Sequence, residues 1–415
     1  MVAKVGKLFT KMTMRDVPLD GKTVLVRADY NVPLNSDGSI SSDFRLQASL
    51  PTLRKLLERR CKIVIISHLG RPEGRDEKFS LRIIAERLAE LLDMPVNFVP
   101  DTVGDLVKMR IKRTSNQSVT LLENLRFYAE EEANDLDFAK RMARDTGAKY
   151  FVQDGFGVVH RAHASTSAIA QVLPGVAGLL LEKEIMMIRG AMQNPKRPLL
   201  AILGGAKVSD KIPVVNALID VADQIVIGGA MANTFLATDG VTVGKSKIEP
   251  EEFDTVRKIH EHVLQRVGES AARNYLIIPS DVAVAGEISP KSRRKIVKID
   301  DMSSDDIALD IGDQTIERYA RAIDRAQTVI WNGTMGMAEI DAFAHGSARL
   351  ALEIAERKGK LVSIIGGGDT ADFVLGWDAR GGASFSHVST GGGASLELMA
   401  GDKLPGVDAL LDGRR

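Results

Sequence analysis

A glycine-rich segment with two lysines, residues 204–212 (GGAKVSDKI), has the composition of a site for a polyphosphate. Gly204 and Gly205 follow an apolar run, so their backbone N–H groups can approach an anion closely. A helix is expected to begin directly afterwards, with its positive end toward the same place. Lys207 and Lys211 are four residues apart, which predicts that both lie on one face of that helix. The alternative is a surface helix with two solvated lysines.

A second segment, residues 365–370 (IGGGDT), follows another strongly apolar run. The backbone of its glycines can surround phosphate oxygens, and Asp369 can hold Mg²⁺ through one carboxylate, as in many magnesium–nucleotide sites. The segment also fits the loose dinucleotide pattern G-x-G-x-x-A. A dehydrogenase is nevertheless disfavoured, because no acidic residue follows about 20 positions later to bind a ribose hydroxyl.

The third segment, residues 389–401 (STGGGASLELMAG), places a glycine triplet before Ala394–Met399, a good helix-forming stretch. The first backbone N–H groups of a helix have no partner within it and carry partial positive charge. Gly391, Gly392 and Gly393 therefore form a further candidate anion site. The alternative is a flexible loop.

The first half of the chain offers arginines and a histidine instead of glycines. The guanidinium fork matches carboxylate and phosphate groups with two hydrogen bonds. A single such residue is better explained by a surface salt bridge, but six at the ends of apolar runs indicate an anion site. They are Arg27, Arg45, His68, Arg71, Arg126 and Arg161. His160 and His163 lack a third metal ligand with suitable spacing and are interpreted as structural.

These residues follow short apolar runs that must be strands. Runs this apolar are buried on both faces, which indicates parallel sheets covered by helices. Helical stretches at 81–92 and 346–358 lie between them, so we predict an α/β fold. Ligands of such sheets bind beyond the carboxyl ends of the strands. The runs are 23–30, 62–70, 119–125, 150–156, 199–205, 224–230, 275–282, 328–333 and 361–369.

The middle of the chain contains a candidate connecting helix. Four apolar residues spaced by four, three and four residues define one helix face (Leu181, Ile185, Ile188 and Met192). Pro195 and Pro198 would end this helix. Nine or more strands exceed a comfortable single sheet, so a helix inside one large sheet is the weaker alternative. We predict a first domain at 1–180, a connecting helix at 181–193 and a second domain at 194–401.

Composition limits the class of protein. The 415 residues are 27% charged with net charge zero, and no apolar run is long enough to span a membrane. Residues 1–180 hold 27 basic against 22 acidic residues and residues 181–415 hold 28 against 33, an excess too small for a nucleic-acid partner. No zinc-type cluster exists, and the single cysteine, Cys61, favours a reducing cytoplasm.

Taken together, the chain closely resembles the phosphoglycerate kinase family. The matching segments span almost the whole sequence, in the order of the family. They are 27–33 (RADYNVP), 67–72 (SHLGRP), 122–128 (LENLRFY), 154–165 (DGFGVVHRAHAS), 204–212 (GGAKVSDKI), 331–336 (WNGTMG), 365–370 (IGGGDT) and 388–401 (VSTGGGASLELMAG).

The resemblance implies two Rossmann-like lobes, each a parallel sheet flanked by helices, joined by a connecting helix. It implies that the C-terminal tail, 402–415, packs on the first lobe. It also implies a monomeric cytoplasmic enzyme that transfers a phosphoryl group between 1,3-bisphosphoglycerate and Mg-ADP. The residues that would hold 3-phosphoglycerate or its bisphosphate are Asp29, Asn31, Arg45, His68, Leu69, Gly70, Arg71, Arg126 and Arg161.

By the same resemblance, the second lobe would hold ADP or ATP with Mg²⁺. Asp369 would bind the metal and Glu339 the ribose, while Lys207, Arg45 and Gly391–Gly393 would surround the transferred phosphoryl group. The remaining nucleotide residues would be Gly205, Lys211, Asn332, Gly366, Gly367, Gly368 and Thr370.

Five positions differ from the usual family pattern, and three of them lie toward the expected nucleoside. The five are Gly155, Asp313, Thr334, Ala338 and Ser347. None of them removes a charge that the chemistry needs. Two alternatives remain: a catalytically silent anion-binding or scaffold protein that keeps the fold, and another nucleotide-dependent acyl-phosphate kinase. The many basic residues of the first half, which could hold a second, distant phosphate, argue against another acyl-phosphate kinase. The presence of Lys207 and Asp369 argues against a silent protein.

Overall fold

The structure is a computed structural model that describes residues 8–413. The chain divides into two compact units: unit 1 is Met1–Met186 with Lys403–Arg415, and unit 2 is Met187–Asp402. Residues 1–7 of the predicted first domain and residues 414–415 of the predicted tail lie outside the described residues.

Unit 1 is built on a six-stranded sheet in which all neighbouring strands are parallel, as predicted. The spatial order is β3-β4-β2-β1-β5-β6. Its central strands are the apolar runs of the sequence, and their side chains are buried on both faces. The strands are β1 (Thr23–Arg27), β2 (Lys62–Ile66), β3 (Val96–Val99), β4 (Ser118–Leu122), β5 (Tyr150–Gln153) and β6 (Gly175–Ala177).

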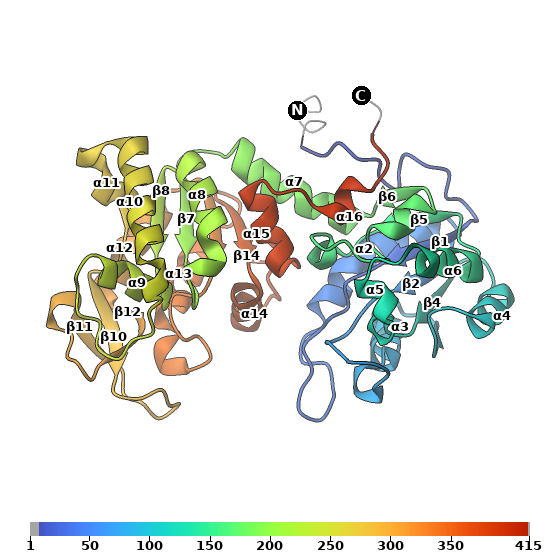
Figure 1. Ribbon diagram of the computed structural model, residues 1–415, viewed down its shortest axis with the longest axis horizontal. Coiled ribbons are helices and arrows are strands. Elements are labelled where there is room, and N and C mark those ends of the chain that lie inside the picture. The colour runs from blue at the N-terminus through green and yellow to red at the C-terminus, as the bar shows by residue number, and fades with distance from the viewer. Residues whose placement is uncertain (1–7, 414–415) are drawn as a thin grey trace. The chain divides into compact units, whose positions relative to one another are not determined.

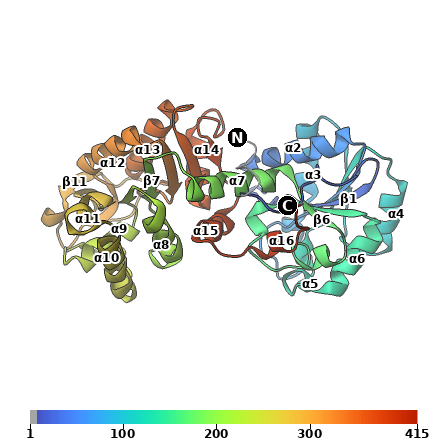
Figure 2. The same ribbon diagram turned by 90° about the horizontal axis from the view of Figure 1, so that it is seen from above.

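Helices cover both faces of this sheet, with α2 and α3 on one side and α5 and α6 on the other (Figure 2). The predicted helix at 81–92 is confirmed as α3, whose Ile84, Ala85 and Leu88 are buried. The helices are α2 (Phe44–Glu58), α3 (Arg82–Leu92), α4 (Asp105–Arg113), α5 (Ala129–Glu132) and α6 (Leu136–Thr146). Short 3₁₀ turns are η1 (Glu77–Phe79), η2 (Leu125–Phe127), η3 (Phe156–Val158) and η4 (Ala168–Gln171).

The C-terminal segment closes unit 1 (Figure 1). After α16 (Pro405–Asp408), the N–H of Leu411 donates to the carbonyl of Gly175 in β6 at 2.9 Å. The N–H of Met12 donates in turn to the carbonyl of Leu411 at 2.7 Å. The Lys11 ammonium lies 2.8 Å from Asp412 Oδ1. Both ends of the described chain therefore border the same edge strand.

Unit 2 contains a second parallel six-stranded sheet, with the order β15-β14-β13-β7-β8-β9. Figure 2 shows α12 and α13 on one side of it and α8 and α10 on the other. The strands are β7 (Leu199–Leu203), β8 (Gln224–Ile227), β9 (Leu276–Ile277), β13 (Thr328–Asn332), β14 (Val362–Gly366) and β15 (His387–Val388).

Helices connect most of these strands in the sequence, and the predicted helix at 346–358 corresponds to α13. They are α8 (Ile212–Val221), α9 (Met231–Thr238), α10 (Phe253–Val267), α11 (Glu269–Tyr275), α12 (Asp313–Arg325), α13 (His345–Glu356), α14 (Gly368–Trp377) and α15 (Gly392–Ala400). Four 3₁₀ turns accompany them: η5 (Ser209–Lys211), η6 (Pro250–Glu252), η7 (Ile299–Asp301) and η8 (Asp341–Phe343).

A third, antiparallel sheet in unit 2 was not predicted. It consists of β10 (Asp281–Ala285) between β11 (Lys295–Lys298) and β12 (Ile307–Ile311). The prediction of a single strand at 275–282 is therefore wrong: β9 belongs to the parallel sheet and β10 to the antiparallel one. Pro279 lies between them and has no N–H to offer a strand ladder.

The chain passes from unit 1 to unit 2 within helix α7 (Leu179–Gln193), which begins two residues before the predicted connecting helix. Leu181, Ile185 and Ile188 on its apolar face are at most 1% exposed. Asp154 caps the helix start, since its Oδ1 accepts from the N–H of Leu180 at 3.0 Å. Burial raises the pKa of Asp154 to about 7.

Candidate functional site

The predicted ligand residues of unit 1 gather beyond the carboxyl ends of its parallel strands. Asp29 and Asn31 follow β1, and residues 68–71 follow β2. Arg126 follows β4 within η2, and Arg161 follows β5 after η3. We call Asp29, Asn31, Arg45, residues 68–71, Arg126 and Arg161 the anion site.

Asp29 and Arg45 form the best-defined contact of the anion site. The Arg45 guanidinium, from the first turn of α2, pairs with Asp29 Oδ2. Asp29 is 7% exposed, and its other oxygen lies 3.8 Å from His68 Nδ1. The carboxylate therefore orients a guanidinium that keeps part of its surface open to a ligand.

The turn after β2 is held by two asparagine side chains. The N–H of Gly70 donates to Asn31 Oδ1 at 2.8 Å, and Asn124 Nδ2 donates to the carbonyl of Leu69 at 2.8 Å. Gly70 has φ +64°, and a Cβ there would lie 2.3 Å from the Phe79 ring. Leu69 is 2% exposed, and Asn124 also accepts from its N–H at 3.3 Å. The structure thus places Leu69 beneath the site as support.

His68 is a neutral hydrogen-bond donor in this arrangement. It is buried, and burial together with Arg27, Arg126 and two further arginines keeps its pKa well below the usual value. Arg27 Nη2 lies 3.1 Å from His68 Nδ1. Because a guanidinium can only donate, Nδ1 must accept, and the proton of the neutral ring is on Nε2. The ring can offer that N–H to an anionic ligand.

Sequence reasoning missed the buried acid that balances Arg27. Arg27 is 1% exposed and donates through Nε to Ser165 Oγ at 2.8 Å. Ser165 Oγ donates in turn to Glu131 Oε1 at 2.5 Å, and the Ser165 N–H donates to Oε2 at 3.0 Å. Burial raises the pKa of Glu131, and the charge of Arg27 opposes that rise. Glu131 stands in a run of three glutamates, so nothing local distinguishes it.

In unit 2, the segment 204–211, which we call the lysine loop, follows β7, contains η5 and leads into α8. Gly205 has φ +96°, and a Cβ there would lie 3.4 Å from Lys211 Nζ. The predicted shared helix face is wrong: Lys207 lies outside any helix, before η5, and α8 begins only at Ile212. The chain needs those residues to turn from the strand into the helix.

The two lysines differ in environment. Lys207 is exposed, whereas Lys211 is half-buried and lies against Gly205. Burial lowers the pKa of Lys211, and the nearby carboxylates of Asp210 and Asp369 oppose that shift. The lysine loop therefore lies next to the glycine segment that carries Asp369.

The N-termini of two helices lie close together at the glycine segment that carries Asp369. α14 begins at Gly368 and α15 begins at Gly392, and a Cβ on Gly392 would lie 3.7 Å from the backbone nitrogen of Gly368. The predicted helix at 394–399 is confirmed within α15, so the flexible-loop alternative is excluded. Partial positive charge from two helices is thus concentrated beside the lysine loop.

Asn332 gives this region an unsatisfied polar group. It is 0% exposed at the end of β13, and within residues 8–413 neither its Oδ1 nor its Nδ2 has a hydrogen-bond partner. A Cβ on Gly367 would lie 3.2 Å from both atoms. Leaving a buried amide without partners is costly, so its position against the glycine loop fits a ligand group. Thr370 Oγ1 accepts from the N–H of Gly333 at 2.6 Å.

The segment with Glu339 follows β13 and is tied to the lysine loop. The carbonyl of Thr334 accepts from the N–H of Gly205 at 2.9 Å, and the carbonyl of Met335 accepts from Gly229 at 2.8 Å. Glu339 is exposed farther along the segment.

A magnesium site at Asp369 fits the residues present. In the described part of the chain, no cluster of three or more His, Cys, Asp or Glu side chains could hold a metal by itself. Mg²⁺ in nucleotide sites uses one or two carboxylates together with substrate phosphates and water. Asp369 is exposed in the first turn of α14, beside the glycine loop, where it could serve in this way.

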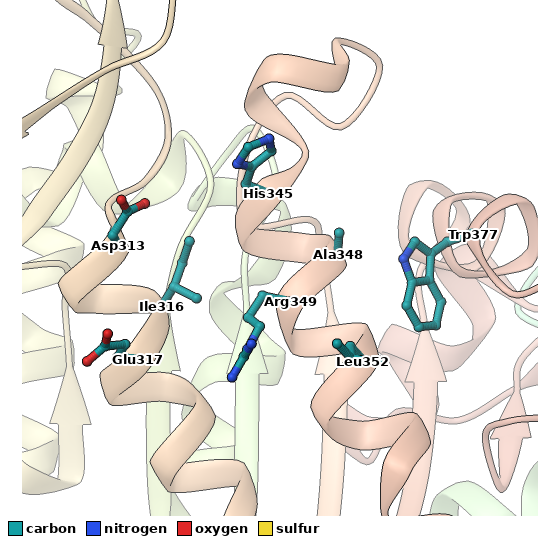
Figure 3. Close-up of a pocket in the computed structure, with 8 residues that line it drawn as sticks. All are labelled: Asp313, Ile316, Glu317, His345, Ala348, Arg349, Leu352 and Trp377. Atoms are coloured by element: carbon teal, nitrogen blue, oxygen red, sulfur yellow. The ribbon is translucent and has the colours of Figure 1, made fainter.

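A separate surface pocket of about 610 Å³ lies between helices of unit 2 (Figure 3). Side chains of α12 and α13 face each other across it, and Trp377 of α14 closes one end. None of the eight residues that line it belongs to the predicted ligand residues. Asp313, one of the atypical positions, instead pairs with Arg294 at 2.9 Å.

These features define a class of protein: a two-unit α/β protein in which one unit carries a set of arginines and the other carries glycine-lined helix N-termini beside two lysines. The chain belongs to the phosphoglycerate kinase family, whose sequence model matches residues 14–402. No described helix is long and apolar enough to cross a membrane.

Individual relatives agree with the family match. The chain is 45% identical to phosphoglycerate kinase of Dictyoglomus turgidum over 405 residues, which cover 97% of this chain and 99% of the relative. It is 45% identical to that of Prochlorococcus marinus over 396 residues, covering 94% and 96%. The solved structure from Coxiella burnetii superimposes with TM-score 0.81 at 36% identity, covering 96% and 98%, and that from Pyrococcus horikoshii with TM-score 0.82 at 32% identity, with the same coverage.

Proposed function

We propose that this chain catalyses reversible phosphoryl transfer between 1,3-bisphosphoglycerate and Mg-ADP, giving 3-phosphoglycerate and Mg-ATP, in glycolysis and gluconeogenesis. The observation that carries the proposal is the pairing of a match over residues 14–402 with retention of the charged groups that the reaction needs. Nothing in the structure favours a silent scaffold. We also propose a monomeric cytoplasmic enzyme, and the buried, unpaired Cys61 fits a reducing compartment.

The anion site would bind the three-carbon substrate. Arg126 and Arg161 would hold its carboxylate or distant phosphate, and His68 would donate its Nε2 proton to an oxygen. Arg71, Asp29 and Asn31 would complete the set, with Leu69 and Gly70 shaping the turn. Guanidiniums grip such anions bidentately, so the site would fix the orientation of the substrate as well as its charge.

The glycine loops and the lysine loop would bind the nucleotide. Gly205, Gly366–Gly368 and Lys211 would approach the phosphates, Asn332 and Thr370 would contact them, and Glu339 would accept from the ribose. Bound at Asp369, Mg²⁺ would neutralise charge on the phosphate oxygens.

Direct transfer needs few acid–base groups. A β-phosphate oxygen of ADP attacks the phosphorus of the acyl phosphate, and the bond from that phosphorus to the carboxyl oxygen breaks. The carboxylate that leaves is a weak base and requires no general acid. Lys207, Arg45 and the amides of Gly391–Gly393 would stabilise the charge on the equatorial oxygens of the transferred group. Water must be excluded, so the proposal requires a closed state formed by hinge motion, in which both substrates are enclosed.

A coupled assay tests the function directly. Purified protein, 1,3-bisphosphoglycerate and Mg-ADP should yield ATP at a rate proportional to enzyme, and a Lys207→Ala preparation serves as the matched control for contaminating kinase. A scaffold protein would bind one or both ligands without forming ATP, and that result would reject the proposal.

A further inference from the structure

The lysine loop is held by a carboxylate that lies about forty residues away in sequence. Glu249 is 7% exposed and precedes η6, in the segment that follows α9. Its Oε2 accepts from the N–H of Val208, and its Oε1 accepts from Ser209 Oγ at 2.6 Å. The N–H of Ser209 lies 3.4 Å from the same Oε2. One side chain thus takes three donors from the two residues that follow Lys207.

The lysine loop has no side-chain cap of its own. Neither Val208 at the start of η5 nor Lys211 at the start of α8 makes a capping hydrogen bond through its side chain. Val208 is buried, so its N–H cannot turn to water instead. Glu249 therefore replaces a local cap, and it adds negative charge at the positive end of a helix.

Glu249 is itself fixed from a different element. Its N–H donates at 3.1 Å to Oγ1 of Thr234, a buried residue of α9. Burial opposes ionisation of Glu249, but the hydrogen bonds from Ser209 and Val208 outweigh it and lower the pKa of this carboxyl group, with help from the charge of Lys207. The carboxylate is therefore charged at neutral pH and placed by packing in unit 2.

Glu249 holds the backbone and leaves the lysine side chain available. Lys207 is exposed, so its ammonium is open to a ligand. The same support sets the path of the chain toward Lys211, which rests on Gly205. Displacing a transition-state donor by about 1 Å can cost about a hundredfold in rate.

We propose that Glu249 is a positioning residue for phosphoryl transfer, which acts by fixing the lysine loop so that Lys207 reaches the transferred phosphoryl group. This inference rests on the proposed function. Glu249 touches neither substrate and is not a catalytic residue. Its effect should fall on turnover and nucleotide binding, and the three-carbon substrate should bind unchanged.

Steady-state kinetics of Glu249→Ala and Glu249→Gln against wild type test the role. We expect Glu249→Ala to lower kcat at least tenfold and to raise the KM for ADP, with the KM for 1,3-bisphosphoglycerate within twofold of wild type. Glu249→Gln keeps one acceptor oxygen and should fall in between. Glu251→Ala is the matched control, because Glu251 is an exposed glutamate of the adjacent η6.

Two readouts separate this role from general destabilisation and from failure of the proposed function. Limited trypsin digestion should cleave after Lys207 at least tenfold faster in Glu249→Ala than in Glu251→Ala, whether or not the protein makes ATP. Inorganic tripolyphosphate, titrated calorimetrically, should bind more weakly to Glu249→Ala. If that variant loses thermal stability but keeps wild-type kcat, ADP affinity and trypsin resistance, the positioning role is wrong. Inactive wild type with the expected digestion and titration results would reject the function and leave Glu249 as the support of the lysine loop.

Discussion

The two units build an anion site from opposite materials. In unit 1, arginine side chains and a neutral histidine surround a buried carboxylate, and Arg27, Arg45 and Arg126 each have a hydrogen-bond or ion-pair partner. In unit 2, glycines bring backbone amides and two helix N-termini together, with one exposed and one half-buried lysine beside them. A guanidinium fork matches the shape of a carboxylate or phosphate group, whereas a lysine ammonium acts as a compact point charge. Under the proposed function, the arginines of unit 1 would mainly orient the three-carbon substrate, and the amides and lysines of unit 2 would mainly stabilise charge on the phosphates.

The largest effect should come from the exposed lysine of unit 2. Lys207→Ala should lower kcat by about 10²-fold or more, because it removes a preorganised donor to the transferred group. Stopped-flow or coupled measurement of ATP formation checks this. Lys245→Ala, at an exposed lysine paired with Asp305, is the control. Turnover at the wild-type rate in Lys207→Ala would contradict the assignment.

The corresponding change in unit 1 should be somewhat smaller. Arg45→Ala removes one cation from a site with several others and leaves Asp29 without its ion-pair partner. We expect kcat to fall about tenfold to a hundredfold. A change confined to KM would show that Arg45 binds ground state and transition state equally, and its transition-state role would be wrong.

The candidate metal ligand of unit 2, Asp369, should affect the Mg²⁺ concentration that activity requires. Asp369→Asn removes the charge that would bind Mg²⁺ while keeping a side chain of the same size at the start of α14. The Mg²⁺ concentration for half-maximal activity should rise severalfold, measured at fixed ADP. An unchanged requirement would place the metal on other groups.

The smallest effect concerns pH and belongs to unit 1 alone. Burial, with the neighbouring arginines, lowers the pKa of His163 to about 4 from 6.5. Between these values the unfolded chain binds a proton that the folded protein does not, so this residue's contribution to stability is present above pH 6.5 and is lost as pH falls toward 4. His163→Gln should therefore lose less stability between pH 7.5 and pH 5 than wild type.

Calorimetric melting measures that difference, which we expect to be about 2 °C or more. Asp154 titrates near pH 7 in the same unit with the opposite sign, so only the comparison between variant and wild type isolates His163. Identical pH slopes in the two proteins would mean that His163 titrates normally in the fold.

Most strands of the two parallel sheets could be predicted from the sequence, because each depends on a local pattern. The same holds for the position of the candidate residues beyond the carboxyl ends of those strands. Short apolar runs indicate buried parallel strands, and glycines directly before a helix indicate backbone N–H groups that are available to an anion. What failed depended on distant partners or on the geometry of the turn. The spacing of Lys207 and Lys211 indicated one helix face, but the turn out of β7 uses the residues between them.

Two buried glutamates show most clearly what could not be predicted from the sequence. Glu131 and Glu249 each support a positively charged part of the site, yet both stand among other glutamates in the sequence. Their roles arise from contacts 34 and about 40 residues away, to Ser165 and to the lysine loop. A single sequence has no local signal for such contacts, and the antiparallel sheet after Pro279 was missed for the same reason.

Isothermal titration of two variants tests whether each unit binds its own substrate. Arg126→Ala should weaken 3-phosphoglycerate binding at least tenfold with Mg-ADP affinity unchanged, and Lys211→Ala should do the reverse. If either variant lost affinity for the other unit's ligand to the same degree, the division of labour between arginines and amides would be contradicted.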